Sequence, residues 1–369
     1  MDQNRLALLA LHFIPGVGDY LVRQVVSYCG SAENVFKTPK GKLLKIPGIG
    51  NVTAEAILNG KPFQQAEKEL IRAEKESVAL LFYTDKKYPS RLKNIPDAPS
   101  VLYTKGNIDF ETQKVVAIVG TRQATSYGKD RVEQLVRDLT PHQALIVSGL
   151  AYGIDIHAHK QSLKQGLPTI GVMGSGMDII YPAAHKETAM KMLETGGLIT
   201  ENPFGTKPDA HNFPERNRII AGLCDALVVI EAAEKGGALI TAEIANSYNK
   251  DVFAFPGSIG ETYSAGCNNL IKTNKAHLLT GIKDLEYIMN WDAATPPKKA
   301  KPTLSLSEFD ESEQVVLKIL IEKKAPVLID EVSWKSNLPV SQLASVLLGL
   351  EFKGVVKSMP GKQYALAYS

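Results

Sequence analysis

Cysteine is scarce in this chain of 369 residues. Its three cysteines, Cys29, Cys224 and Cys267, lie far apart and fit none of the paired spacings that make zinc or redox sites. Their number is odd, which argues against a disulfide framework. We therefore expect a protein of a reducing compartment, the cytoplasm.

Long apolar runs are missing as well, so no segment is predicted to cross a bilayer. The first residues carry charges at Asp2 and Arg5 and show no small-residue cleavage site. We expect neither an export signal nor membrane contact. The hydrophobic content of 44% is nevertheless enough for packed cores, and the length predicts two or three domains.

Several catalytic and cofactor motifs are absent. No phosphate-binding loop of the form G-x-x-x-x-G-K-[ST] and no G-x-S-x-G occurs, and Gly174-Ser-Gly-Met-Asp-Ile179 lacks the third glycine of a dinucleotide fingerprint. His157 and His159 stand two apart on a predicted helix and point to different faces, and Asp155 is expected to cap that helix. No metal-binding carboxylate cluster suggests a nuclease. We expect no enzyme, no cofactor and no metal.

Charge of either sign is nearly balanced. A net charge of +3 permits a polyanionic partner without arguing for one. Residues 1–65 carry seven Lys and Arg against four acids, whereas residues 303–369 carry seven Lys against eight acids. The last segment is therefore the least suited to bind nucleic acid.

The pattern along the chain predicts three domains and a linker. Residues 1–77 contain an internal repeat, Ile14-Pro-Gly-Val-Gly18 and Ile46-Pro-Gly-Ile-Gly50, flanked by helical periodicity. Each copy predicts a helix-hairpin-helix, a motif that either binds DNA backbone or only packs. The proline-rich, basic residues 293–305 predict an extended linker. Residues 306–369 have the layout of a winged helix, with helices over 312–322, 329–336 and 340–352 and strands over 355–358 and 364–367.

Residues 78–292 alternate between short β-rich runs and amphipathic helices, which is typical of a doubly wound parallel sheet. The strands are expected over 115–119, 144–147, 169–173, 197–200, 226–230 and 252–255. The helices are expected over 129–139, 156–165, 185–194 and 239–248.

The loops that follow these strands share small, glycine-rich or hydroxyl-bearing sequences. Ligands bind outside the carboxyl ends of the strands in an open parallel sheet, and exposed amides at helix starts suit phosphate. The loops are Gly120-Thr-Arg122, Ser148-Gly-Leu150, Gly174-Ser-Gly176, Glu201-Asn-Pro203, Glu231-Ala-Ala233 and Pro256-Gly-Ser258. The sequence therefore predicts an anion-binding edge.

Three arginines add positive charge to this edge. Arg122 ends the first strong strand, and Arg216 and Arg218 are expected in the first turn of a helix, where cations oppose the helix dipole. A bound phosphate explains them, although an ion pair with Glu215 or Glu231 is the simpler alternative.

Aromatic residues lie in or beside the same loops: Tyr152, Tyr181, Phe204 and Phe213. Aromatic rings beside a phosphate groove stack bases, and this is how proteins hold single strands without reading sequence. Core packing is the alternative, and it suits Tyr181 better than Phe213. A duplex would shield its bases, so a single strand is the expected ligand.

The order of longer motifs points to a known family. The motifs are Val119-Gly-Thr-Arg122, Ser148-Gly-Leu-Ala-Tyr-Gly-Ile-Asp155 with His159, Gly174-Ser-Gly-Met-Asp178 with Tyr181-Pro182, Phe213-Pro-Glu-Arg-Asn-Arg-Ile-Ile-Ala-Gly222, Leu239-Ile-Thr-Ala242, Phe253-Ala-Phe-Pro-Gly257 and Ser264-Ala-Gly-Cys-Asn-Asn-Leu-Ile271. With them the chain resembles the DprA family, the DNA-processing proteins of natural transformation, over nearly its whole length.

The resemblance implies an extended Rossmann-like core between a helical, SAM-like N-terminal domain and a winged helix. It also implies a homodimer that binds and protects single-stranded DNA and loads the RecA recombinase. The expected DNA-binding residues are Gly120, Thr121, Arg122, Ser148, Gly149, Gly174, Ser175, Gly176, Phe213, Arg216, Asn217, Arg218, Lys235 and Gly237.

Two positions depart from the family pattern. Lys235-Gly-Gly-Ala238 stands where members often have Lys-Ser-Gly-Ser, and Ala183 stands where some have lysine. The alternative function is that of a nucleoside-monophosphate-hydrolysing enzyme of the related Rossmann superfamily, since Gly236-Gly237 with Thr241 and Glu243 is loosely similar to its motif. The predicted recognition helix, 340–352, has one charged residue, Glu351, so we expect it to contact protein rather than DNA.

Overall fold

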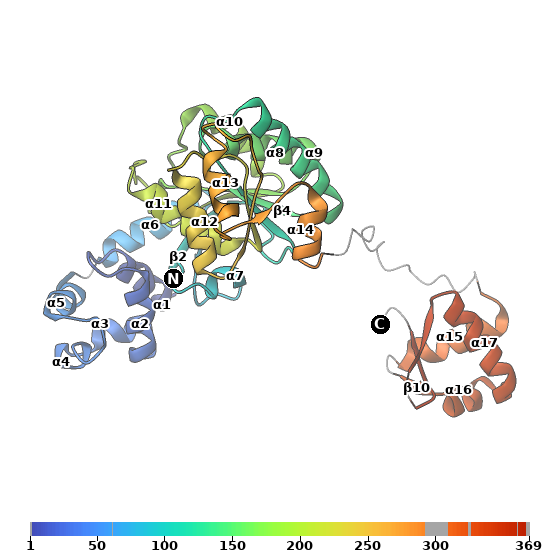
Figure 1. The fold of residues 1–369 in the computed structure, drawn as a ribbon. Coiled ribbons are helices and arrows are strands. Elements are labelled where there is room, and N and C mark those ends of the chain that lie inside the picture. Colours follow the sequence, from blue (N-terminus) through green and yellow to red (C-terminus); the bar gives the residue numbers. More distant parts are fainter. Residues whose placement is uncertain (1, 61, 292–308, 324–325, 360, 367–369) are drawn as a thin grey trace. The chain divides into compact units, whose positions relative to one another are not determined.

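The computed structural model describes residues 2–60, 62–291, 309–323, 326–359 and 361–366. The chain divides into two compact units between Ala294 and Thr295 (Figure 1). The segments 1–77 and 78–292, expected as separate domains, pack together in the first unit. The predicted linker over 293–305 lies outside the described residues.

The N-terminal segment is helical, as predicted. Its helices are α1 (Gln3–His12), α2 (Asp19–Cys29), α3 (Ala32–Lys37), α4 (Lys40–Leu43), α5 (Asn51–Gly60) and α6 (Phe63–Lys75). The two Pro-Gly repeats form the turns before α2 and α5, with Gly16 and Gly48 at φ of +79° and +82°. Fully buried Leu8, Leu9 and Leu11 join a core that continues into the first strand of the sheet.

The second segment contains a nine-stranded sheet of order β1-β2-β6-β5-β4-β3-β7-β8-β9. The strands are β1 (Ala79–Phe82), β2 (Val101–Gly106), β3 (Val115–Val119), β4 (Leu145–Ser148), β5 (Thr169–Val172), β6 (Gly197–Thr200), β7 (Ala226–Val229), β8 (Asp251–Ala254) and β9 (His277–Leu278). Neighbours from β6 to β9 are parallel, which confirms the predicted doubly wound sheet. The antiparallel strands β1 and β2 and the two-residue β9 were missed.

Helices cover both faces of the sheet because the side chains on both faces of its central strands are apolar. On β3, Val116 and Ile118 face one core, while Val115, Ala117 and Val119 face the other. The first core is shared by α8 (Ser126–Leu139), α9 (Ile154–Gln165) and α14 (Ile282–Ile288). The second is shared by α7 (Ser90–Lys93), α11 (Asn212–Leu223), α12 (Gly237–Ser247) and α13 (Ala265–Lys272). The remaining helices are α10 (Lys186–Met192), which packs beside α9, and the short 3-10 turns Thr140–His142 and Ala183–His185.

The strand order reverses at β3. From β3 the chain runs through α8 to β4 on one side, and from neighbouring β7 through α12 to β8 on the other. Because α8 and α12 leave on opposite faces, the loops after β3 and β7 part at the carboxyl edge. Such a switch point is where open α/β sheets bind ligands.

The second unit is a winged helix, as predicted. It contains α15 (Glu311–Lys323), α16 (Ile329–Ser336) and α17 (Val340–Phe352), with a sheet of order β10-β12-β11. The strands are β10 (Val327–Leu328), which was missed, β11 (Val356–Met359) and β12 (Gln363–Leu366). The predicted last position of the final strand, residue 367, lies outside the described residues.

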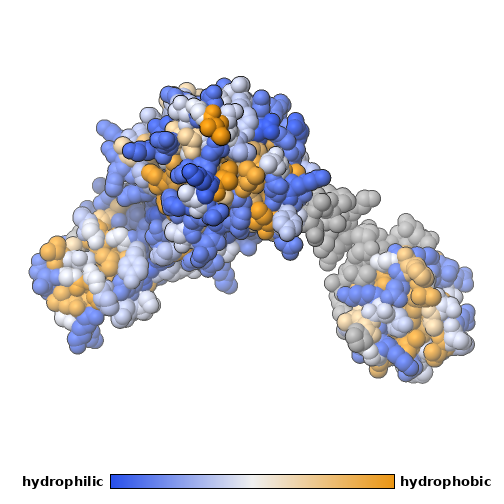
Figure 2. Space-filling model, viewed as in Figure 1, coloured by the Kyte–Doolittle hydropathy of each residue, from blue (hydrophilic) through white to orange (hydrophobic). Residues whose placement is uncertain are grey.

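The surface of α17 is partly apolar. Val340, Leu348 and Phe352 are exposed, whereas Glu351 is bonded to Ser358 through its side chain. Apolar patches are visible on the face of this unit that Figure 2 shows. The absence of exposed cations at these positions fits the expected protein contact, which stays a prediction. Within the described ranges, every helix is too short or too polar to span a bilayer.

The separate core of the second unit leads to a prediction. Leu347 is fully buried on α17, so Leu347→Ala should destabilise the winged helix by about 2–5 kcal/mol. Differential scanning calorimetry should show a lower transition temperature for this unit and an unchanged transition for residues 2–291. The control Leu348→Ala, at a position 54% exposed, should shift neither. Loss of both transitions together would contradict separate cores.

Candidate functional site

An open cleft lies at the switch point. It encloses about 1730 Å³ together with its mouth and lies between the loop after β3, the loop after β7, and the starts of α11 and α12. Eight predicted site residues line it: Gly120, Thr121, Arg122, Phe213, Arg216, Asn217, Lys235 and Gly237. The structure therefore brings together residues that are up to 117 positions apart in the sequence, from Gly120 to Gly237.

Arg122 is the exposed cation of the loop after β3. The loop is fixed on both sides, because the Thr121 amide donates to the Glu231 carbonyl (2.8 Å) and the Ile154 amide donates to the Thr121 carbonyl (3.1 Å). The Arg122 guanidinium lies over the Phe213 ring, 5.6 Å from its centroid. Glu231, a considered ion-pair partner, instead accepts from the Thr125 amide (3.0 Å) and hydroxyl (2.5 Å). Arg122 thus keeps its charge at the cleft.

The start of α12 supplies backbone donors to the same cleft. Its N-cap is Gly236, and no side chain among the described residues caps it. A Cβ on Gly236 would meet no described atom within 4 Å, so the first turn of the helix faces open space. Lys235 is exposed beside it, and Asn217 donates from Nδ2 to the Gly237 carbonyl (3.4 Å). Free amides, the helix dipole and a lysine together favour an anion here.

The other predicted glycine loops are filled by the protein itself. A Cβ on Gly120 would lie 2.5 Å from Ile154 Cγ1, one on Gly149 2.4 Å from Asp155 Oδ2, and one on Gly174 2.9 Å from Phe213 Cδ1. At Gly176 it would lie 2.4 Å from the Pro203 carbonyl oxygen. These glycines are needed for close packing, which explains them without a phosphate.

The two predicted serines also point inward. Ser148 is fully buried and donates to the Ile118 carbonyl (2.6 Å), and Ser175 donates to the Ile179 carbonyl (2.6 Å). The expectation that these hydroxyls face the rim does not match the structure. The reason is that a buried hydroxyl requires a partner, and a nearby backbone carbonyl supplies it in each case.

Arg216 lies at the floor of the cleft and not at its mouth. The residue is 6% exposed, its guanidinium donates to the Val172 carbonyl, and Nε donates to Asn217 Oδ1 (3.3 Å). Burial lowers the pKa of Arg216 to about 10, although the charge of Asp155 opposes the shift. Asp155 is the second residue of α9 rather than its cap, which is Gly153. Burial raises the pKa of Asp155, with Arg216 as the main opposing charge.

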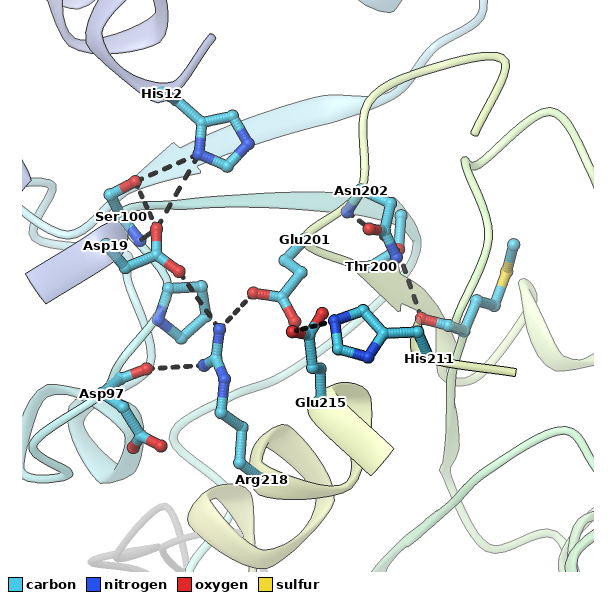
Figure 3. A network of polar contacts seen from close by, with 12 residues as sticks. His12, Asp19, Asp97, Ser100, Thr200, Glu201, Asn202, His211, Glu215 and Arg218 are labelled. Carbon is cyan, nitrogen blue, oxygen red and sulfur yellow. Dashed lines mark hydrogen bonds and ion pairs between the residues drawn. The ribbon is translucent and has the colours of Figure 1, made fainter. Parts of the chain in front are cut away.

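Arg218 does not line the cleft. Its guanidinium points toward internal acids (Figure 3). It forms ion pairs with Glu201 and with Asp19 (3.1 Å) and donates to the Asp97 carbonyl (2.6 Å). Its alternative partner Glu215 is instead paired with His211 (3.1 Å). Arg216 and Arg218 are the fifth and seventh residues of α11, so both lie in its second turn rather than its first. The expectation that Arg218 adds charge to the rim is therefore corrected.

The acids around Arg218 differ in their pKa. Burial raises the pKa of Glu201 to about 7 even though Arg218 opposes the shift, and the negative charge of Asp19 adds to it. The pKa of Asp19 falls to about 2, because the hydrogen bond and charge of His12 and the hydrogen bonds of Ser100 together outweigh its burial. The carboxylates of Asp19 and Glu201 both accept from the same Nη2 nitrogen of Arg218. Their negative charges repel each other, and the repulsion raises the pKa of Glu201.

Exposed aromatic rings extend the cleft on the β4 and β5 side. A smaller pocket is lined by Arg122, Tyr152, Tyr181 and Phe213, among others. Tyr152 is 51% exposed and Tyr181 is 47% exposed, whereas Phe213 is half-buried. Core packing was expected to suit Tyr181 better than Phe213, and the structure shows the reverse. Tyr181 is the more exposed ring, and Phe213 packs against Gly174. Phe204 belongs to the N-terminal core, where it contacts Tyr103 and Arg72.

The geometry offers little support for metal binding or for nucleotide hydrolysis. His159 is buried and bonded to Thr169 Oγ1 (2.7 Å) and the Gly149 carbonyl (2.6 Å). In the part of the chain that the structure describes, no group of three His, Cys, Asp or Glu could hold a metal ion. Glu243, the acid of the loose nucleotide-hydrolase motif, pairs with Lys275 (2.6 Å) and does not line the cleft.

Comparison with known proteins extends these observations. The DNA recombination-mediator protein A family matches residues 79–290, the DprA winged helix domain matches 294–362, and a SAM-like helix-hairpin-helix tandem matches 8–60 and 40–81. Protein Smf of Synechocystis is 32% identical over 96% of this chain and 97% of its own length. DNA processing protein DprA of Streptococcus pneumoniae is 42% identical over 54% of this chain and 70% of its own length.

Two solved structures share the fold. DNA processing protein A from Streptococcus pneumoniae has a TM-score of 0.65 at 33% identity, covering 78% of this chain and 98% of that one. The protein of the same name from Helicobacter pylori has a TM-score of 0.53 at 29% identity, covering 58% and 95%. The description of the Helicobacter structure concerns its binding mode for single-stranded DNA.

The raised pKa of Glu201 leads to a prediction about stability. The pKa of Glu201 in the folded protein, about 7, exceeds its ordinary value of 4.5. Protonated Glu201 therefore contributes its full stabilisation to the folded state below pH 4.5, and this stabilisation is lost as the pH rises through 7. The free energy of unfolding of Glu201→Gln, relative to the parent, should therefore rise by about 2 kcal/mol from pH 5 to pH 8. Asp19, with its pKa of about 2, titrates outside this window.

Urea unfolding at several pH values measures this difference. The control is Glu187→Gln, which removes an exposed acid whose pKa is lowered by Lys191, and its difference should be constant across the window. Parallel curves for Glu201→Gln and the parent would show that Glu201 is ionised without cost.

Proposed function

The chain belongs to the DNA recombination-mediator protein A family, and from this premise we propose that the cleft at its switch point binds single-stranded DNA. The phosphates lie between Arg122 and the start of α12, and the bases lie toward Tyr152 and Tyr181. The role is binding rather than catalysis. The relatives named DNA processing protein support a role in DNA processing during natural transformation.

One observation carries this proposal: an exposed guanidinium and an uncapped helix start face the same open cleft. Arg122 stands on the loop after β3, and Lys235 and Gly236 stand at the start of α12. Charge-assisted bonds from a guanidinium and free amides are what a phosphate accepts. Gly236 and Ala238 carry no hydroxyl, so backbone amides and Lys235 supply the donors on this side.

The shape of the cleft favours a polymer over one nucleotide. Its mouth is open, and it continues into the pocket beside Tyr152 and Tyr181. Those rings are about half exposed, so unpaired bases can stack on them. Paired bases in a duplex are shielded, and a duplex would contact the rim through phosphates alone.

The wider role follows from the family. We propose that the protein protects single strands in the cytoplasm, acts as a homodimer and loads the RecA recombinase onto the bound strand. The apolar side chains exposed on α17, Leu348 and Phe352 among them, support a protein contact for the winged helix. The Helicobacter relative, described by its binding mode for single-stranded DNA, supports the choice of ligand.

Fluorescence anisotropy of a labelled oligothymidine over a salt series tests the proposal. Arg122→Ala should weaken binding about tenfold, as expected for a lost charge-assisted contact. It should also flatten the logarithmic salt slope by about 0.7, as expected for one phosphate contact to a single strand. Arg137→Ala removes an exposed arginine of α8 that does not line the cleft and should change neither value.

Three outcomes would overturn the proposal. Equal slopes for Arg122→Ala and the parent would remove this arginine from the phosphate track. Tighter binding to a duplex than to a single strand of equal length would remove the role of base stacking. Release of free base from nucleoside monophosphates would favour the hydrolase instead.

A further inference from the structure

The helix that carries Phe213, Arg216 and Asn217 to the cleft is held from behind by the N-terminal segment. Arg218, the next residue on α11, reaches Asp19, which is the first residue of α2. Both side chains are about 85% buried, with exposures of 15% and 14%. Figure 3 shows this contact at the centre of a network that joins residues far apart in the sequence.

Asp19 is itself held in place on the side away from Arg218. Its Oδ1 accepts from the Ser100 amide (2.8 Å) and the Ser100 hydroxyl (2.6 Å), and His12 Nδ1 lies 3.8 Å away. The carboxylate is therefore fixed between the loop before β2 and Arg218. A fixed acid at this place specifies where the guanidinium, and hence this turn of α11, can lie.

The same loop holds the second helix of the cleft. Asp97 accepts from Arg218 through its carbonyl (2.6 Å) and from the Tyr248 hydroxyl through Oδ1 (2.5 Å). Tyr248 is the C-cap residue of α12, whose other end presents Gly236 and Gly237 to the cleft. At the cleft, Asn217 bonds to the Gly237 carbonyl and links α11 to α12 directly. Both ends of α12 are thus tied to the second turn of α11, one directly through Asn217 and the other through Asp97 to Arg218.

We propose that Asp19, acting through Arg218, is a positioning residue for the cleft, so that the N-terminal helical segment sets the affinity of the cleft for single strands. The inference rests on the proposed function. Asp19 touches no nucleic acid in this arrangement. It fixes the placement of Phe213 and Asn217, because both residues stand on the same short helix as Arg218, within two turns of it.

Substituting Asp19 distinguishes a positioning role from simple electrostatics, because the two predict opposite changes in affinity for single-stranded DNA. A protein that binds a polyanion gains affinity when it loses a negative charge, since long-range repulsion falls. If Asp19 positions α11, Asp19→Asn should instead lose affinity. A merely structural role would lower stability without changing the affinity of the folded fraction.

The experiment measures binding of labelled oligothymidine to the full chain at a temperature where each variant is folded. Asp19→Asn should weaken binding about 5-fold with an unchanged salt slope, because no phosphate contact is lost. Glu33→Gln, which removes an acid of the same segment that is 38% exposed and paired with Lys37, should bind as the parent does or slightly tighter. Hydrogen exchange of residues 212–218 should be faster in Asp19→Asn than in the parent.

Tyr248→Phe provides a second, milder variant in case Asp19→Asn does not fold. It removes only the hydroxyl that bonds to Asp97 and should weaken binding about 2-fold, again with an unchanged slope. Parental or tighter binding by a folded Asp19→Asn would overturn the inference, as would parental binding by Tyr248→Phe where only that variant folds. Failure of the parent to bind single strands would overturn the proposed function, which is a distinct result.

Discussion

A buried guanidinium must be paired with an acid or hydrogen-bonded to several carbonyls. This constraint explains why the three arginines of the site lie in different environments. Arg218 is paired with Glu201 and Asp19, and Arg216 lies near Asp155 and the Val172 carbonyl. Arg122 is the arginine of the three that stays in solvent. The accessible charge of the cleft is therefore smaller than the arginine count of its loops. The other positive features at the cleft are Lys235 and the peptide dipoles at the start of α12.

The central sheet was predictable because buried parallel strands are continuous apolar runs. The predicted strand over 115–119 coincides with β3, and 197–200 coincides with β6. The outer strands β2 and β9 escaped detection for physical reasons. β2 ends in Lys105 and Gly106, where the chain is no longer buried, and β9 has two residues, too few to show a period. The antiparallel pair of β1 and β2 also lacks the crossover helix by which parallel strands are recognised in a sequence.

The site was predicted at the level of loops but not of side-chain direction. Proximity of the strand ends follows from topology, so the meeting of Arg122, Phe213 and Lys235 needed only the strand order. The direction of Arg218 depends on Asp19, which is 199 positions away, and no local pattern records such a partner. Glycine is ambiguous for the same reason. A glycine leaves open space at Gly236, whereas at Gly149 it leaves room for the Asp155 side chain.

The two Pro-Gly repeats have similar sequences but make different contacts. The first turn of α2 contains Asp19, a favourable place for an acid, and that acid is bound to Ser100 and Arg218. The first turn of α5 contains no acid among the described residues. The first hairpin thus contributes its charge to the support of α11, inside a core shared with the sheet. The winged helix closes its own core around Leu343 and Leu347 instead. The N-terminal helical segment is therefore physically continuous with the unit that carries the cleft.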